Sequence, residues 1–180
     1  EARGALVDDA ALVGVHLLDL DRRLADCDAE VAGMTDLVDE LGRVTHVGLL
    51  LRQAADGTIS RMVVSGRVLY GERIRDAVLR HLEKDLGPLA LPRIPPEVAP
   101  FTVVEYFPDA EVSGFQDPRH HAVSLAFVVP VAGDCQPTQQ ALDLRWFTPE
   151  EAISEEVRRE MTGGHDRLIR LALAHVGQLP

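Results

Sequence analysis

The sequence predicts an α+β fold, an α/β/α sandwich around a mixed sheet with an N-terminal helical extension. One observation is the order of the expected elements: a helix, a group of strands, a second helix, more strands and closing helices. Another is the composition, 46% hydrophobic and 26% charged over 180 residues, which is typical of one globular domain with at most a short appended element. We therefore expect residues 1–30 to form the extension and residues 31–180 the main domain.

The extension is expected to be helical from Asp8 to about Glu30. Asp8 and Asp9 can cap a helix, and apolar residues then recur at spacings of three and four. This pattern favours a helix packed on its own domain, although it also fits a coiled-coil seam, and its acidic, amphipathic character is compatible with a homodimer. The apolar positions are Val13, Leu17, Leu20, Leu24, Cys27 and Val31.

Two turn sequences divide the next part of the chain into strands. The turn at residues 39–42 predicts a hairpin between strands 31–38 and 44–52, and the turn at residues 55–57 leads into a strand at 58–64.

The remaining elements follow from turn and capping residues. A helix is expected from Arg73 to Leu86, because Gly87 and Pro88 provide a C-terminal stop. Five of the eleven prolines lie between Pro88 and Pro100, so this segment is expected to be an irregular loop. Further strands are predicted at 101–107, 123–131 and 142–147, a helix from Thr148, and a last helix at 165–176.

The predicted helix 73–86 carries an ionisable pair on its apolar side. At 100° per residue, His81 and Asp85 lie one turn apart within the apolar stripe, and Lys84 lies at its edge. One interpretation is a His–Asp hydrogen bond at the edge of a core. The other is the wall of a site in which these side chains hold a cation or a phosphate-bound metal.

Residues 66–88 resemble the Nudix hydrolase superfamily, whose hallmark is a box: Gly, five residues, Glu, seven residues, then Arg-Glu-apolar-x-Glu-Glu-x-Gly-apolar. The sequence aligns with this box without a gap, and the resemblance extends over about residues 31–176. The matching positions are Gly66, Glu72, Arg80, Leu82 and Gly87, with Gly71 and Ala77 acceptable at looser positions. The departures are His81 and Lys84 in place of glutamates, the shorter Asp85, and Pro88 in place of an apolar residue.

The resemblance implies a Nudix-like fold and cleavage of a nucleoside diphosphate linked to a second group, with box glutamates holding Mg²⁺ or Mn²⁺. It implies Asp85 and His81 as the catalytic and metal-binding residues. The metal is then held weakly or is absent, because Asp85 is the one carboxylate left at the three expected positions. A nitrogen ligand from His81 would suit Mn²⁺ better than Mg²⁺. It also implies that Gly66, Gly71, Glu72, Arg80 and Gly87 form the framework of the box.

Lys84 places a fixed cation where the family has a metal-binding anion. Two like charges about 4 Å apart repel by several kcal/mol at an effective dielectric constant near 20. One hypothesis is that Lys84 replaces the metal as a phosphate anchor, with Arg67 and Arg52 as further phosphate contacts. The alternative is that Lys84 faces solvent beside a box that has lost its activity.

The predicted function is a Nudix-type hydrolase of nucleoside diphosphate derivatives with a modified, weak metal site; the alternative is a non-hydrolytic nucleotide or nucleotide-sugar binding protein.

Other residues are weaker candidates. A further family carboxylate would fall near Gln139 or Gln140, neither of which carries charge. Residues that could substitute for it are Glu105, Glu111, Asp117 and Asp143. We interpret His120 and His121 as exposed residues at the start of a strand, Arg61 as a weak phosphate candidate, Trp146 as core packing, and Cys27 and Cys135 as unreactive thiols.

Charge and hydropathy exclude other classes of partner. With 18 basic and 29 acidic residues and a net charge of −11, the chain is not expected to bind a nucleic acid duplex, because duplex binding relies on basic residues. The longest nearly uncharged apolar stretch, residues 122–133, is shorter than the ~20 residues of a membrane helix. Two cysteines do not make a disulfide framework, which favours a reducing, cytoplasmic setting. The expected ligand is a nucleotide-type small molecule.

Overall fold

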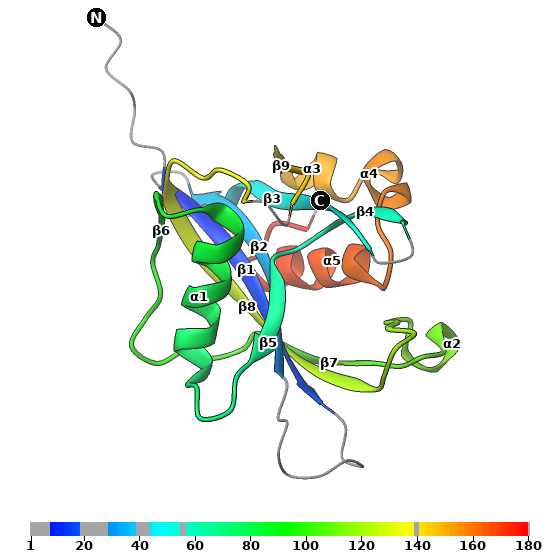
Figure 1. Ribbon diagram of the computed structural model, residues 1–180. Coiled ribbons are helices and arrows are strands. Elements are labelled where there is room, and N and C mark those ends of the chain that lie inside the picture. The colour runs from blue at the N-terminus through cyan, green and yellow to red at the C-terminus, as the bar shows by residue number, and fades with distance from the viewer. Residues whose placement is uncertain (1–7, 19–28, 39–43, 55–56, 139–140, 180) are drawn as a thin grey trace, which may run out of the picture.

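The computed structural model describes residues 8–18, 29–38, 44–54, 57–138 and 141–179, the first two segments as backbone only. Within these segments, nine strands form one sheet, flanked by five helices (Figure 1). The strands are β1 (Asp8–Leu18), β2 (Ala29–Val38), β3 (Val44–Gln53), β4 (Ile59–Met62), β5 (Ser65–Val68), β6 (Ala90–Pro92), β7 (Thr102–Tyr106), β8 (Ala122–Gly133) and β9 (Asp143–Phe147). The helices are α1 (Ile74–Leu86), α2 (Ala110–Ser113), α3 (Pro149–Ala152), α4 (Glu155–Arg159) and α5 (His165–His175).

The sheet is mixed, as the sequence predicts. Its main path runs β4-β3-β2-β5-β1-β8-β6, and in addition β9 pairs with β3 and β7 pairs with β8. β1 and β5 are parallel, and so are β2 and β8, whereas the other pairs are antiparallel.

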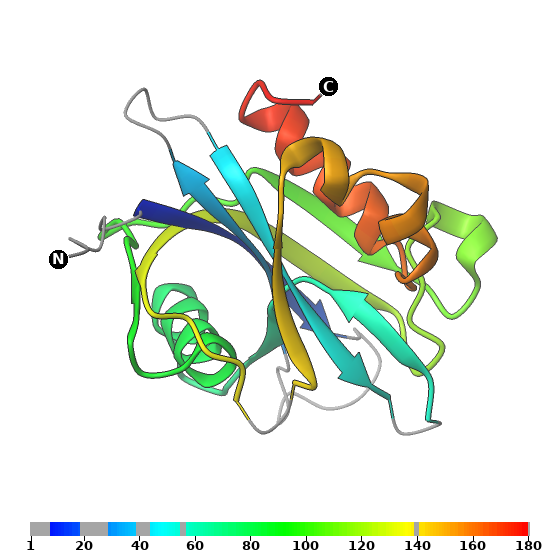
Figure 2. The same cartoon turned by 90° about the horizontal axis from the view of Figure 1, so that it is seen from above.

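Helices cover both faces of the sheet, which gives the predicted sandwich. α1 lies on one face and α5 on the other (Figures 1 and 2), and a separate hydrophobic core fills each interface. β3 contributes to both cores because successive side chains of a strand point to opposite faces. Leu49 packs in the core under α5, whereas Leu50 packs in the core under α1.

The predicted N-terminal helix is wrong for residues 8–18, which form β1. This strand hydrogen-bonds to β8 along its whole length and also pairs with β2 and β5. A strand with neighbours on both edges often reads as a continuous apolar run, which cannot be distinguished from a buried helix by periodicity. Residues 19–28 lie outside the described part of the chain. The homodimer therefore stays a prediction and loses the amphipathic helix that suggested it.

Most other predicted elements are confirmed. β2 and β3 form the expected antiparallel pair, and β4 returns along β3. Thr148 caps α3 through a capping box with Glu151 and a proline in the first turn. The predicted loop after α1 also contains β6, a short edge strand in which Pro92 is tolerated. The helices α2 and α4, each about one turn long, are not predicted from the sequence.

Candidate functional site

The loop before α1 is fixed to the helix by a glutamate–arginine pair. The Glu72 carboxylate accepts hydrogen bonds from Nε and Nη2 of Arg80, both at 2.7 Å, and from the Leu69 amide at 2.8 Å. Arg80 also donates from Nη2 to the carbonyl of Arg67 at 2.8 Å. The Arg80 guanidinium is the main cause of a lowered Glu72 pKa. A two-pronged pair of this kind fixes geometry as well as charge, so these two residues hold the loop in place.

His81 lies between this loop and the helix and is almost completely buried. Its Nε2 lies 2.8 Å from the Arg67 carbonyl, to which it donates when the ring is neutral. The His81 ring packs directly on the backbone of Gly66, because a Cβ at residue 66 would lie 1.8 Å from Cε1 of His81 and would exclude the ring. Burial, followed by the Lys84 and Arg80 cations, lowers the His81 pKa to about 3. At neutral pH the ring is therefore uncharged, and its buried Nδ1 has no hydrogen-bond partner among the described residues.

Asp85, the one remaining carboxylate of the three expected box positions, is paired with two cations. Oδ2 lies 2.5 Å from Nη2 of Arg52 on β3, and Oδ1 lies 3.4 Å from Nζ of Lys84. The Asp85 side chain is 0% exposed, Arg52 is 16% exposed and Lys84 is 32% exposed. Two cations thus face one anion, and the cluster carries an excess positive charge.

Burial determines the protonation tendencies of this cluster. It raises the pKa of the Asp85 carboxyl in spite of the opposing effects of Arg52 and Lys84. It also lowers the pKa of the Lys84 ammonium, which Asp85 counteracts and Arg52 reinforces. Charged groups with little water around them depend on each other for stabilisation. The three side chains therefore act as one unit.

The chain after β8 closes the C-terminal end of α1. The Thr138 hydroxyl donates to the carbonyl of Lys84, and the Gln136 amide donates to the carbonyl of Leu86 at 2.8 Å. Gly87 ends the helix with φ at 87°, a value that favours glycine. These bonds satisfy helix carbonyls that would otherwise lack partners. Gln139 and Gln140 lie outside the described residues.

The described residues do not fit a divalent metal ion. Mg²⁺ requires several oxygen ligands in octahedral geometry, whereas this site offers one carboxylate that already faces two cations. The Arg67 carbonyl accepts from both Arg80 and His81. No group of three or more His, Cys, Asp and Glu side chains within the described segments could hold a metal. A divalent ion would in addition be repelled by Arg52 and Lys84.

The structure distributes the other sequence candidates over different parts of the fold. Asp117 pairs with Arg119 and His120, and His121 lies 3.5 Å from Glu105. Glu111 lies on α2, on the opposite side of the molecule from α1 in both views (Figures 1 and 2). These carboxylates do not complete the Asp85 cluster.

Two of the lesser candidates have structural contacts. Arg61 is buried, binds Glu160 at 2.7 Å and lies over the ring of Phe147. Cys135 is partly buried and packs against the core under α1, and Cys27 lies outside the described residues. Arg61 thereby joins β4 to the residue that follows α4.

Sequence reasoning missed the role of Arg52 as the partner of Asp85. The signal was available in β3, because residues two apart lie on the same face of a strand. Leu50 packs against α1, so Arg52 also lies on the face toward that helix. Arg52 had been predicted only as a phosphate contact.

A mixed sheet between α1 and α5, with a glycine-bounded loop leading into α1, defines a Nudix-like α+β protein. The chain belongs to the family described as "Domain of unknown function (DUF4916)", which it matches over residues 29–178. It is also similar to a solved structure from Jonesia denitrificans described as a "possible asymmetric diadenosine tetraphosphate (Ap4A)" hydrolase. The two are 59% identical with a TM-score of 0.76, and the match covers 79% of this chain and 90% of the other. No curated protein matches the chain.

The described helices also bear on membrane association. None of them has both the length and the apolar character needed to cross a bilayer.

Proposed function

We propose that this protein binds a nucleoside diphosphate derivative at α1 and hydrolyses it slowly, as a Nudix-type phosphohydrolase with an altered site. The observation that carries the proposal is the cluster of Arg52, Lys84 and Asp85. In this cluster two partly exposed cations, Arg52 on β3 and Lys84 on α1, flank the carboxylate at which the Nudix resemblance expects a phosphate-bound metal. The similarity to a possible hydrolase of diadenosine tetraphosphate supports the choice of nucleotide class.

The cationic pair has donors left for a phosphate chain. An arginine carries five N–H donors and a lysine three, which is more than the two oxygens of the Asp85 carboxylate can accept. Hydrogen bonds between such cations and phosphate oxygens are stronger than neutral ones. Arg52 and Lys84 would therefore neutralise phosphate charge without a divalent ion.

The same residues explain why hydrolysis would be slow. An efficient general base has a pKa near the working pH, whereas burial and neighbouring cations lower the pKa of His81 to about 3. The Asp85 carboxylate is engaged with Arg52 and Lys84. Neither side chain is suited to activate water at neutral pH.

A protein that binds the nucleotide without turnover is the second candidate. It is favoured by the poor fit of the donor set to a divalent ion. In this case the nucleotide would be a sensed ligand, and the framework of Glu72 and Arg80 would serve only to keep the loop in place.

Binding and product formation, measured separately, test both candidates. We would titrate diadenosine tetraphosphate and a nucleotide sugar by calorimetry in EDTA, Mg²⁺ and Mn²⁺, and follow products by anion-exchange chromatography. We expect binding in EDTA, weakened about tenfold or more in Lys84→Met, because a hydrogen bond to a charged group contributes about 1.5–3 kcal/mol. Arg75→Met, on the same helix, should bind like the wild type.

The outcomes separate the candidates. Products that form with the wild type and are lost in Lys84→Met would select the hydrolase, and a ligand-induced rise in Tm without products would select the binding protein. Binding that requires Mg²⁺, or that Lys84→Met leaves unchanged, would contradict the metal-independent anchor.

A further inference from the structure

Ser60 on β4 lies beside Arg52 of the Asp85 cluster. The two residues are paired in the register of β3 and β4, and directly opposed residues of an antiparallel pair point to the same face of the sheet, with Cβ atoms about 4.5–5.5 Å apart. Met62, two residues after Ser60, packs against the core under α1. The Ser60 side chain therefore also lies on the face that carries α1.

The Ser60 hydroxyl is nearly buried but unpaired. The residue is 4% exposed, and its hydroxyl forms no hydrogen bond with any residue that the structure describes. Its oxygen is not one of the unpaired polar atoms that the protein encloses completely, so a ligand can reach it. A nearly buried hydroxyl without a partner is unfavourable, and such a group in a folded protein calls for an explanation.

The charge around this hydroxyl favours an anionic partner. Arg52 and Lys84 face the single carboxylate of Asp85, which leaves the cluster with an excess of positive charge. A serine hydroxyl donates one hydrogen bond, and a donor next to two cations complements a phosphate oxygen better than a neutral acceptor.

We propose, building on the function proposed above, that Ser60 is a further phosphate-binding residue of this site. Its hydroxyl donates to an oxygen of the same phosphate chain that Arg52 and Lys84 bind. Ser60 and Arg52 belong to the sheet and Lys84 belongs to α1, so the phosphate chain is held between two elements of the fold. This contact gives the Ser60 hydroxyl the partner that no described residue supplies.

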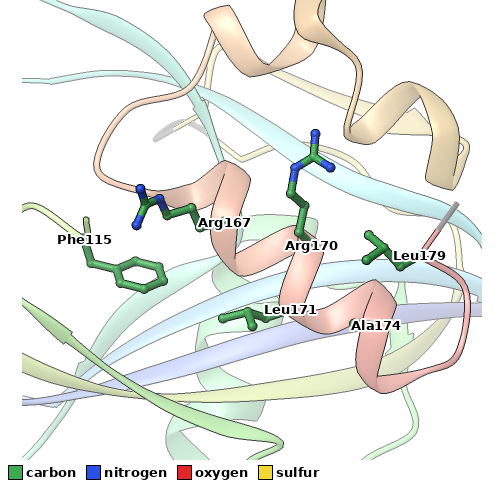
Figure 3. A pocket seen from close by; sticks show the side chains of 6 residues that line it. All are labelled: Phe115, Arg167, Arg170, Leu171, Ala174 and Leu179. Carbon is green, nitrogen blue, oxygen red and sulfur yellow. The ribbon is translucent and has the colours of Figure 1, made fainter. Parts of the chain in front are cut away.

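The hollow over α5 does not offer the same chemistry. It has a volume of about 390 Å³ and lies on the other face of the sheet (Figure 3). Its lining is mostly apolar, and the guanidinium groups of Arg167 and Arg170 point apart, to the carbonyls of Ser113 and Ile153. A phosphate chain is therefore expected on the face of Ser60 rather than in this hollow.

Calorimetry in EDTA with diadenosine tetraphosphate and with inorganic pyrophosphate tests the contact. We expect Ser60→Ala to weaken the binding of both probes about tenfold, because it removes a hydrogen bond to a charged group. Ser60→Thr, which keeps a hydroxyl, should bind both probes like the wild type. The Tm of free Ser60→Ala should not fall, since the free protein loses no hydrogen bond. Ser124→Ala is the matched control, because it removes a similarly buried, unpaired hydroxyl from the face toward α5; it should leave both affinities unchanged.

The results distinguish this inference from the proposed function. Failure of both probes to bind the wild type in EDTA would overturn the two together. Binding that Lys84→Met weakens and Ser60→Ala leaves unchanged would overturn the role of Ser60 alone. A loss of affinity in Ser60→Ala that is confined to the dinucleotide would also overturn it, because pyrophosphate has no nucleoside. A fall in the Tm of free Ser60→Ala without a loss of affinity would assign Ser60 a structural role instead.

Discussion

Replacement of Arg52 by methionine should destabilise the fold more than any other change in the Asp85 cluster. The substitution keeps a long apolar stem and removes the guanidinium that lies 2.5 Å from Asp85. It leaves a carboxylate that is 0% exposed with Lys84, at 3.4 Å, as its one cationic partner in the cluster. Removing one member of a buried ion pair typically costs about 3–5 kcal/mol.

We expect a loss of about 3 kcal/mol at pH 7, the lower end of that range, because Lys84 remains. The loss of stability is limited because Asp85 can become protonated and so avoid an unpaired buried charge. Each unit by which the Asp85 pKa lies above its ordinary value of 3.8 corresponds to about 1.4 kcal/mol. Asp85→Leu should cost less, about 1–2 kcal/mol, because the cations it leaves are partly exposed. The double variant should lie within about 1 kcal/mol of the wild type, since buried pairs are often replaceable by apolar residues.

Urea unfolding followed by the fluorescence of Trp146, the single tryptophan, measures these effects. With a slope near 2 kcal/mol/M for a domain of this size, Arg52→Met should lower the midpoint by about 1.5 M. The loss of stability in Arg52→Met should be smaller at pH 4 than at pH 7. The folded-state pKa of Asp85 is raised, so protonation at low pH removes the unpaired charge. Arg75→Met removes an exposed ion pair with Asp76 and an exposed hydrogen bond to the Pro95 carbonyl, and it should change stability by less than about 1 kcal/mol.

A loss below about 1 kcal/mol in Arg52→Met would refute this reasoning. Additive effects in the double variant would also refute it, since single losses that sum to about 4–5 kcal/mol and a double variant within about 1 kcal/mol of the wild type require a coupling free energy of about 3 kcal/mol or more.

Three further predictions concern the loop and helix around the cluster. The His81 pKa is lowered from 6.5 to about 3, so the unfolded chain takes up the proton at a higher pH than the folded chain does. The free energy of unfolding should therefore fall as the pH drops below 6.5, by about 2 kcal/mol at pH 5. In urea titrations, His81→Gln should flatten this pH dependence. Gly66→Ala should lower stability by about 1–3 kcal/mol by overpacking, and His81→Ala in the same chain should restore part of the loss in Tm; no recovery would contradict the contact. Glu72→Gln should cost about 1–2 kcal/mol of stability, because Arg80 then faces a neutral amide in place of a carboxylate. An unchanged urea midpoint at pH 7 would argue against a stabilising Glu72–Arg80 pair.

The elements that sequence alone predicted correctly are those with strong local signals. α1 combines a helical apolar period with a Gly-Pro stop, and its observed end at Leu86 agrees with that signal. The antiparallel pairing of β2 with β3 follows from two apolar runs separated by a turn sequence. These signals act over a few residues, so they can be read without knowledge of the rest of the fold.

The features that sequence did not predict depend on contacts between distant segments. β1 owes its strand conformation to pairing with β8, more than one hundred residues away, whereas its local apolar spacing suggested a helix. The Arg52–Asp85 pair joins β3 to α1, and no spacing rule relates residues 52 and 85. The contact between Gly66 and His81 likewise requires the loop to fold back on the helix.

The position of Arg52 on β3 also limits how this protein could gain metal-dependent chemistry. Restoring glutamate at residues 81 and 84 would recreate the motif of the family in the primary structure, yet the guanidinium would still neutralise Asp85 from the neighbouring strand. An engineered or evolutionary route to a metalloenzyme therefore has to change β3 together with the helix. Conversely, a homologue that carries an acidic triad on this helix is expected to have a neutral or smaller residue where this chain has Arg52.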